Sequence, residues 1–235
     1  MSYGKVLVVM PCFNHEDFVI EAINSLHNQT YKNYDLICCD DKSTDSTLEI
    51  LKREQDKFGY QILKNEENLG TGKTVNKCID YALQNYDYEY ITWISSDNIL
   101  KPNFLELHVG LLDQGYAITY SGWSYKDQPI KHMPNENLIH LKHNFMLGPS
   151  FVFRKKLFLK AGPFQEGAGE DYYFSVNCAL AFAKFGYIKE YLVDYRYHLN
   201  SVTGRDPHPT RKACSGEAIQ KSKLIFSENG FMNYI

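Results

Sequence analysis

The sequence predicts an α/β fold: a Rossmann-like, mixed and mainly parallel sheet flanked by helices. Two observations lead to this prediction. Short apolar runs alternate with segments of helical periodicity through residues 1–100, which is typical of parallel strands joined by helical crossovers. A chain of 235 residues, of which 44% are hydrophobic, can also bury the core that such a sheet needs.

Four strands and three helices are expected in the first half. The strands are the apolar runs at residues 5–10, 35–40, 60–63 and 90–94. The first helix covers residues 15–29 and presents one apolar face, made of Phe18, Val19, Ala22, Ile23 and Leu26. The second helix runs through Leu48, Leu51 and Phe58, with Ser43 or Thr44 as its cap, and the third covers residues 71–84.

The second half is expected to be less regular. It contains helical patterns at residues 103–114 and 171–185 and strand-like runs at 117–121 and 151–154. Residues 126–145 are polar and include two prolines, so we interpret them as a long irregular segment of the kind that often forms a binding loop or lid. The residues after Val193 are basic and are expected to form an arm or cover.

The composition argues against several classes of partner. The chain has 25 basic and 28 acidic side chains, so no nucleic-acid partner is expected. No apolar run reaches the ~18 residues of a membrane-spanning helix, and the N-terminal run is too short for a signal peptide. The six cysteines form no CxxC pair, and we interpret them as reduced core thiols of a cytoplasmic protein.

Polar loops follow the predicted parallel strands, at the edge where this class of sheet binds its ligands. They cover residues 11–14, 40–43, 65–72 and 95–98, and we expect them to bring Asn14, Asp41, Asn68 and Asp97 together. Asp97 is a lone acid at the end of an apolar strand. It suits a divalent cation that takes its other ligands from phosphate and water, although an acid in an ordinary turn is the simpler interpretation.

The stretch NLGTGKT, residues 68–74, resembles a phosphate-binding P-loop only in part. The full pattern places a glycine five residues before Gly72, and that position holds Glu67. The loop also follows the third strand rather than the first, so a P-loop kinase or NTPase is rejected. Lys73 lies at the start of a helix and can still bind an anionic ligand. The alternative interpretation is that Lys73 is an ordinary solvated lysine.

Three further motifs each have a functional and a structural interpretation. Asp41 can accept a hydrogen bond from a nucleobase imide, while the residues after it cap a helix. Asp171 follows Gly-Glu at the start of a helix and can act as a general base or simply complement the helix dipole. His198 follows Tyr-Arg-Tyr and can bind a metal or a phosphate, although a single histidine usually does neither.

Six motifs occur in the order PCFN, DDKSTDST, NLGTGK, SSDN, G-x-F with GED, and YRYH, and this order resembles the family 2 GT-A glycosyltransferases. The likeness covers residues 5–203, and the stretch YITWISSDNILKP is similar to the family's spore-coat polysaccharide members. The resemblance implies a GT-A fold, a nucleotide-diphosphosugar donor, a bound Mn²⁺ or Mg²⁺, and inversion at the anomeric carbon.

The resemblance also assigns roles to individual residues. The residues that would contact the nucleotide-sugar are Pro11, Phe13, Asn14, Asp41, Asn68, Gly70, Lys73, Ser96 and Asp97. Asp40 would support its neighbour Asp41. Asp41 would read the uracil imide, which favours a UDP-sugar. Asp97 would bind the metal, with His198 as a second candidate ligand, and Asp171 would be the catalytic base.

One departure from the family pattern lies beside Asp97. The place of a second acid holds Ser95 or Ser96, which implies weak metal binding when the donor is absent. The missing acid motivates an alternative, a catalytically inactive nucleotide-sugar-binding domain of a larger assembly. Otherwise one domain is expected over residues 1–235, with a nucleotide-sugar half (1–100), an acceptor half (101–205) and an arm (206–235).

The acceptor is expected to be a hydroxyl group of a glycan or of a lipid-linked molecule, in the synthesis of a surface polysaccharide or glycan. Residues 126–145 are expected to border it. Peripheral contact with a membrane, the transferred sugar and the oligomeric state stay open at this stage.

Overall fold

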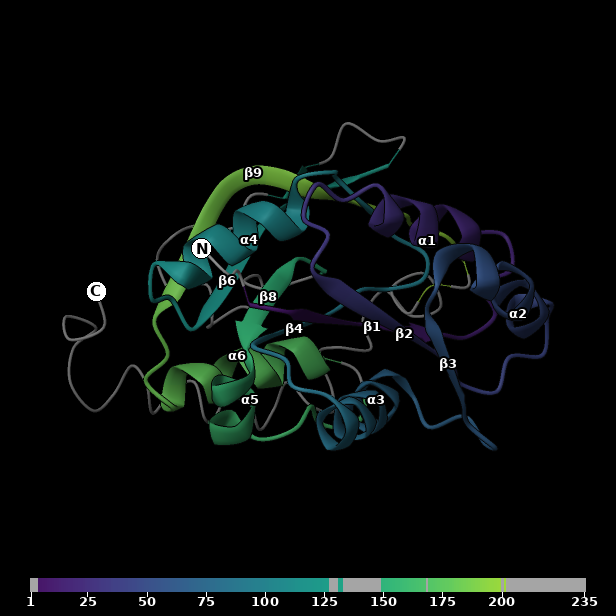
Figure 1. Cartoon of the computed structure of the whole chain (residues 1–235), viewed down its shortest axis with the longest axis horizontal. Helices are drawn as coiled ribbons and strands as arrows, with labels where there is room; N and C mark the ends of the chain where they lie inside the picture. The colour runs from purple at the N-terminus through teal and green to yellow at the C-terminus, as the bar shows by residue number, and fades with distance from the viewer. Residues whose placement is uncertain (1–3, 127–130, 133–148, 168, 200, 202–235) are drawn as a thin grey trace.

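The computed structural model describes residues 4–126, 131–132, 149–167, 169–199 and 201. Its strands are β1 (Val6–Cys12), β2 (Tyr34–Asp40), β3 (Gln61–Lys64), β4 (Tyr90–Trp93), β5 (Ile99–Leu100), β6 (Ile118–Tyr125), β7 (Lys131–His132), β8 (Phe151–Arg154) and β9 (Phe185–Tyr195). Its helices are α1 (Val19–His27), α2 (Thr47–Phe58), α3 (Thr71–Asn85), α4 (Phe104–Asp113), α5 (Lys155–Ala161) and α6 (Glu170–Leu180). Within these residues the strands form one sheet, in the order β3-β2-β1-β4-β8-β6-β9-β5, and β7 pairs with β6 (Figure 1).

The first half of the sheet is parallel. β1 lies between β2 and β4, and β2 continues to β3, all in parallel register. The antiparallel strand β8 then joins β4 to β6, and β6 pairs in parallel with β9 across a register shift near Gly122. The predicted mixed, mainly parallel sheet flanked by helices is therefore confirmed.

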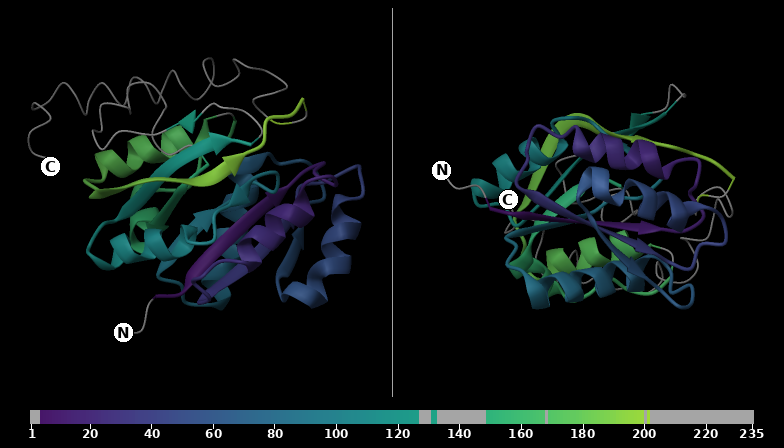
Figure 2. Two further views of the ribbon diagram at one scale, coloured as in Figure 1. Left: turned by 90° about the horizontal axis from the view of Figure 1, so that it is seen from above. Right: turned by 45° about the vertical axis from the view of Figure 1, so that its right-hand side comes forward.

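Two apolar clusters cover the two faces of the sheet. Alternate residues of β1 divide between them, because successive side chains of a strand point to opposite faces. Leu7 and Val9 pack with α3, α5 and α6, whereas Val6, Val8 and Met10 pack with α1, α2 and α4. The two sets of helices lie on opposite sides of the sheet (Figure 1 and Figure 2). This double cover explains why the parallel strands are apolar without alternation.

Two predicted helix starts are wrong. α1 begins at Val19 rather than at residue 15. α2 begins at Thr47, so Ser43 and Thr44 are not its caps. The N-cap residue is Ser46, whose side chain forms no capping hydrogen bond. The carboxylate of Asp45, one residue earlier, accepts the backbone N–H of Thr47 at 3.0 Å. The sequence DDKSTDST offers several capping side chains in a row, and residue type alone could not choose among them.

The second half differs most from the prediction. α6 ends at Leu180 and does not reach residue 185 as predicted. Two residues after its end, Phe182 adopts a left-handed conformation with φ 59°. β9 then runs from Phe185 to Tyr195, a strand that was missed because its apolar residues do not alternate regularly. α5, β5 and β7 were also missed. Most of the predicted irregular segment 126–145 and the whole predicted arm 206–235 lie outside the described residues.

Two further expectations concern the cysteines and the membrane. The five described cysteines are buried and free, namely Cys12, Cys38, Cys39, Cys78 and Cys178. In the part of the chain that the structure describes, no helix is both long enough and apolar enough to span a membrane.

His108 on α4 predicts an acid-sensitive step in stability. The side chain is fully buried and donates to Thr119 Oγ1 at 2.9 Å, while its Nε2 has no hydrogen-bond partner. Burial lowers the pKa of His108 from 6.5 to about 3. The unfolded chain therefore takes up the proton first, so stability is kept above pH 6.5 and falls by roughly 1.4 kcal/mol per pH unit below it.

We therefore expect His108→Met to reduce this pH dependence, as seen in urea unfolding at pH 7.5 and 5.5. The free energy of unfolding of the wild type should fall between these pH values by about 1.4 kcal/mol more than that of the variant. His27→Ala provides the control, because it removes a histidine that is exposed rather than buried. Equal pH dependence in wild type and His108→Met would contradict the argument.

Candidate active site

The loop after β1 ties the neighbouring strand ends together. The backbone N–H of Asp41 donates to the carbonyl of Cys12 at 2.8 Å. Asn14 donates its N–H to Ser43 Oγ at 3.1 Å and accepts the N–H of Thr44 at 2.8 Å. Asn14 does this from a left-handed conformation with φ 54°, which asparagine tolerates better than most residues. The ends of β1 and β2 therefore form one rigid edge.

Asp41 organises the loop between β3 and α3. The side chain is only 4% exposed. Its carboxylate accepts the Asn65 amide at 2.7 Å and the N–H groups of Leu69 and Gly70 at 2.8 and 2.9 Å. The Asn68 amide donates to the Asp41 carbonyl at 3.2 Å. Since an ionised carboxylate has about four acceptor sites, Asp41 can accept about one further donor.

Asp97 lies between two imidazole rings just beyond β4. Its Oδ2 is 3.1 Å from Nε2 of His198 and 3.7 Å from Nε2 of His15. Its Oδ1 is buried and has no hydrogen-bond partner. Burial raises the pKa of Asp97, but the hydrogen bond from His198 and the neighbouring His15 lower that pKa more, so the net shift is downward. Asp97 is therefore held as a buried anion.

Both imidazole rings are fixed by neighbours. Nδ1 of His15 lies 2.7 Å from the hydroxyl of Ser96, which donates to the carbonyl of Pro11 at 3.0 Å. The His198 ring stacks on Phe18, with the ring centroids 4.3 Å apart. The loops after β1 and β4 and the segment after β9 thus meet at Asp97.

Arg196 clamps this arrangement from the end of β9. Its Nε donates to the carbonyl of Asp97, and its Nη atoms bond Glu21 at 2.7 Å and the carbonyl of Phe18 at 3.0 Å. Its backbone N–H donates to Asn98 Oδ1 at 3.2 Å. The buried guanidinium therefore holds the loop after β4 against the start of α1.

The N-terminus of α3 packs against the segment that leads into α6. A Cβ atom at Gly72 would overlap the carbonyl oxygen of Gln165 and would lie 3.7 Å from Cβ of Glu170. The Asn76 amide pairs with both backbone groups of Phe164, at 2.8 and 3.0 Å. Position 72 is therefore restricted to glycine by close approach rather than by backbone conformation.

The Gly72→Ala substitution is expected to separate these two segments. We expect the free energy of unfolding to fall by about 1–3 kcal/mol, because the backbone of residue 165 must move. Gly110 in α4 is the matched control, since its Cβ position is open and an alanine there should stabilise the helix by about 0.5–1 kcal/mol. Thermal unfolding measures both, and equal stability of the two variants would refute the packing argument.

Asp171 is the second residue of α6, and its Oδ1 accepts the N–H of Tyr172 at 2.7 Å. Burial raises the pKa of Asp171 to about 6. Burial and the charge of Asp171 together raise the pKa of Glu170 to about 8. At pH 7 Asp171 is therefore mostly ionised and Glu170 mostly protonated, and a carboxylate with a pKa near neutrality suits a general base.

Two predicted residues have other partners in the structure. Lys73, the residue expected near a diphosphate, is exposed and forms an ion pair with Glu166 at 2.9 Å. Ser96, the candidate for a ribose contact, is fully buried between Pro11 and His15. His15 was not singled out from the sequence, although it follows Asn14 in the loop after the first strand.

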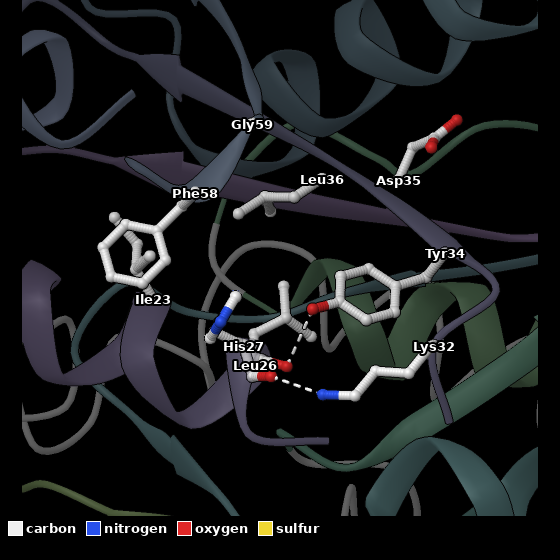
Figure 3. Close-up of a pocket in the computed structure, with 9 residues that line it drawn as sticks. All are labelled: Ile23, Leu26, His27, Lys32, Tyr34, Asp35, Leu36, Phe58 and Gly59. Atoms are coloured by element: carbon white, nitrogen blue, oxygen red, sulfur yellow. Dashed lines mark hydrogen bonds between the residues drawn. The ribbon is translucent and has the colours of Figure 1, made fainter. Parts of the chain in front are cut away.

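A cavity of about 190 Å³ lies elsewhere, at the start of β2 and the ends of α1 and α2 (Figure 3). Its polar side chains already have protein partners. Lys32 Nζ donates to the carbonyl of His27 at 2.8 Å, and the Tyr34 hydroxyl donates to the carbonyl of Leu26 at 2.9 Å. The cavity lies at the opposite end of β2 from Asp41 and is not part of the candidate site.

The sequence of this chain is similar to those of known glycosyltransferases. Residues 7–183 match the profile described as glycosyl transferase family 2. An uncharacterised glycosyltransferase of Methanocaldococcus jannaschii is 30% identical over 241 residues, covering 95% of this chain and 77% of that protein. A poly(ribitol-phosphate) beta-glucosyltransferase of Bacillus spizizenii is 31% identical over 209 residues, covering 82% of this chain. The chain spans 32% of the Bacillus enzyme and 54% of a similar Rickettsia typhi glycosyltransferase.

Solved structures show the same fold. The S. aureus TarS 1–349 complex with UDP-GlcNAc has a TM-score of 0.73 at 20% identity, covering 94% of this chain and 65% of that one. The mannosyltransferase PcManGT of Pyrobaculum calidifontis, in complex with GDP-Man and Mn²⁺, has a TM-score of 0.68 at 14% identity, covering 96% and 74%. The fold expected from the motif order is therefore confirmed.

Proposed function

Because the chain belongs to glycosyltransferase family 2, we propose that it moves a sugar from a UDP-sugar to a hydroxyl group of a glycan or lipid-linked acceptor, with inversion. The observation that carries the proposal is the edge of the sheet at Asp41 and Asp97. There Asp41 fixes a glycine-containing loop, and the buried carboxylate of Asp97 has an unpartnered oxygen. The end of β1 connects the two, because Cys12 accepts the N–H of Asp41 and Pro11 accepts the hydroxyl of Ser96. The TarS complex with UDP-GlcNAc supports a uridine donor, while PcManGT binds GDP-Man.

The donor set at Asp97 fits a divalent cation. A buried anionic oxygen without a hydrogen-bond partner is costly, and a cation held by Asp97 and His198 would remove that cost. When bound, the cation supplies a positive charge that stabilises the departing diphosphate. The family relationship and this fit support a metal-dependent transferase.

The chain's own residues would perform the remaining steps. Asp41 accepts the imide N–H of the uracil ring at its remaining acceptor site, beside Pro11, Phe13 and Asn14. Asp171 takes the proton from the acceptor hydroxyl as that oxygen attacks the anomeric carbon. The loop of Asn68 and Gly70, together with Lys73, holds the base and diphosphate.

Calorimetric titration with UDP, dTDP, GDP and ATP, each with and without Mn²⁺, tests the proposal. Tight UDP binding that needs Mn²⁺ supports it, and turnover of a panel of UDP-sugars with product analysis then identifies the sugar. Tighter binding of GDP or ATP would overturn the assignment of Asp41. Nucleotide binding without turnover of any nucleotide-sugar would favour an inactive donor-binding domain instead.

A further inference from the structure

The imidazole of His15 is the second ring, besides that of His198, that faces the buried carboxylate of Asp97. His15 comes from the loop after β1, far in sequence from both Asp97 and His198. Each of these three residues offers one possible ligand atom, and these three atoms all lie within 4.8 Å of one another. Two ligand atoms that share one metal ion at about 2.1 Å each lie roughly 3 Å apart. The separations of 3.1 and 3.7 Å from Asp97 Oδ2 to the two Nε2 atoms are close to that geometry.

The hydrogen bonds of Ser96 determine the tautomer of neutral His15. The Ser96 hydroxyl has one proton, which it donates to the carbonyl of Pro11 at 3.0 Å, because a carbonyl can only accept. Its contact with Nδ1 of His15 at 2.7 Å must therefore be an N–H donated by the histidine. In the neutral ring, Nε2 is then the nitrogen that carries the lone pair, and it lies 3.7 Å from Oδ2 of Asp97. A cation placed between these two atoms can bind both.

The hydrogen bond from Nδ1 of His15 to Ser96 is of the kind that metal-binding histidines usually form. A ligating imidazole commonly donates its second N–H to a carbonyl, carboxylate or hydroxyl group, which fixes the ring and its tautomer. The Ser96 to Pro11 relay supplies that contact for His15, and Phe18 orients His198 by stacking at 4.3 Å. The backbone N–H of His15 is also held, at 2.8 Å from Thr47 Oγ1.

We propose that His15 is a protein ligand of the divalent metal, so that the site holds its ion through two imidazoles and one carboxylate before any nucleotide binds. The inference rests on the proposed function only for the location of the metal. It replaces the expectation of a weak, Mg²⁺-like site, because His15 compensates for the acid that Ser95 or Ser96 replaces. Imidazole-rich sites favour later transition metals over Mg²⁺. The affinity of the nucleotide-free protein should therefore increase in the order Mg²⁺, Mn²⁺, Co²⁺.

The test is metal binding to the nucleotide-free chain of 235 residues, with Co²⁺, Mn²⁺ and Mg²⁺ added separately. Calorimetry gives the affinities, and the visible absorption of protein-bound Co²⁺ reports imidazole coordination. His15→Ala is expected to weaken Co²⁺ binding by about 10- to 100-fold, and His27→Ala, which removes an exposed histidine, should change nothing. Wild-type affinity in His15→Ala, or a wild type that prefers Mg²⁺, would overturn the proposal.

A second measurement on the wild type does not depend on the folding of a variant. Proton–nitrogen spectra of the imidazole rings, recorded with and without diamagnetic Zn²⁺, should show metal-induced shifts at Nε2 of His15 and His198. A shift at His198 alone would also overturn the proposal. Because nucleotide is absent throughout, failure of sugar transfer and failure of this metal site are separate outcomes.

Discussion

Asp171→Asn is expected to slow sugar transfer severely while leaving donor binding nearly intact. Removal of a positioned general base costs about 10²- to 10⁴-fold in rate, so kcat should fall by about 1,000-fold. Asparagine keeps the shape of the side chain and its oxygen can still accept the N–H of Tyr172. The measurements are the turnover of a UDP-sugar and calorimetric titration with UDP and Mn²⁺. An equal loss of donor affinity and turnover would contradict the role of a base.

Glu170→Gln is the matched control for this experiment. Glu170 has its pKa raised to about 8 and is mostly protonated at pH 7, so a glutamine resembles it in shape and charge. Its turnover should stay close to that of the wild type. The wild-type rate should also fall as the pH drops through about 6, because protonated Asp171 cannot accept a proton. A rate that is independent of pH between 5 and 7 would argue against Asp171.

Asp41→Ala is expected to destabilise the protein and to remove donor binding. The Asn65 amide and the N–H groups of Leu69 and Gly70 all lose their charged acceptor. A hydrogen bond to a charged group contributes about 1.5–3 kcal/mol. Water can replace part of the loss at the part-buried N–H groups of Leu69 and Gly70, and the Asn65 amide keeps Thr74 Oγ1 as an acceptor. The free energy of unfolding should therefore fall by roughly 3 kcal/mol. Urea unfolding measures this loss, and Asp56→Ala, at an exposed acid of α2, is the control for charge.

Asp41→Asn separates the base-reading role from loop stability. A carboxylate accepts the uracil imide N–H, whereas an asparagine amide can donate to the ring nitrogen of cytosine. The ratio of UDP affinity to CDP affinity should therefore fall in Asp41→Asn, whatever the loss in stability. An unchanged ratio would mean that Asp41 orders the loop but does not read the base.

The first half of the fold could be predicted because its strands and helices carry local signals. β1, β2 and β4 contain apolar runs, while β3 has only an Ile-Leu pair between polar ends. α3 begins directly after Gly70. β9 could not be predicted in this way. Its burial alternates irregularly along the strand, and its position is set by pairing with β6, a contact between residues distant in sequence.

The same limit applies to the site. Asp41 and Asp97 were found because each follows a buried strand, where topology brings loops together. His15 was not, because nothing local distinguishes it from an exposed loop histidine, and only the folded chain shows that its ring faces Asp97. The role of Arg196 also depends on a contact between distant residues, because its clamp joins the end of β9 to the loop after β4.

The Arg196 clamp has a consequence for the order in which the protein matures during translation. The residues of β1 to β4 leave the ribosome first, and at that time the loop bearing Asp97 still lacks Arg196 and His198. These two residues follow β9, one of the last described segments to be synthesised. A nascent chain that ends before β9 would therefore carry an incomplete form of the proposed metal site, which needs the residues that follow β9.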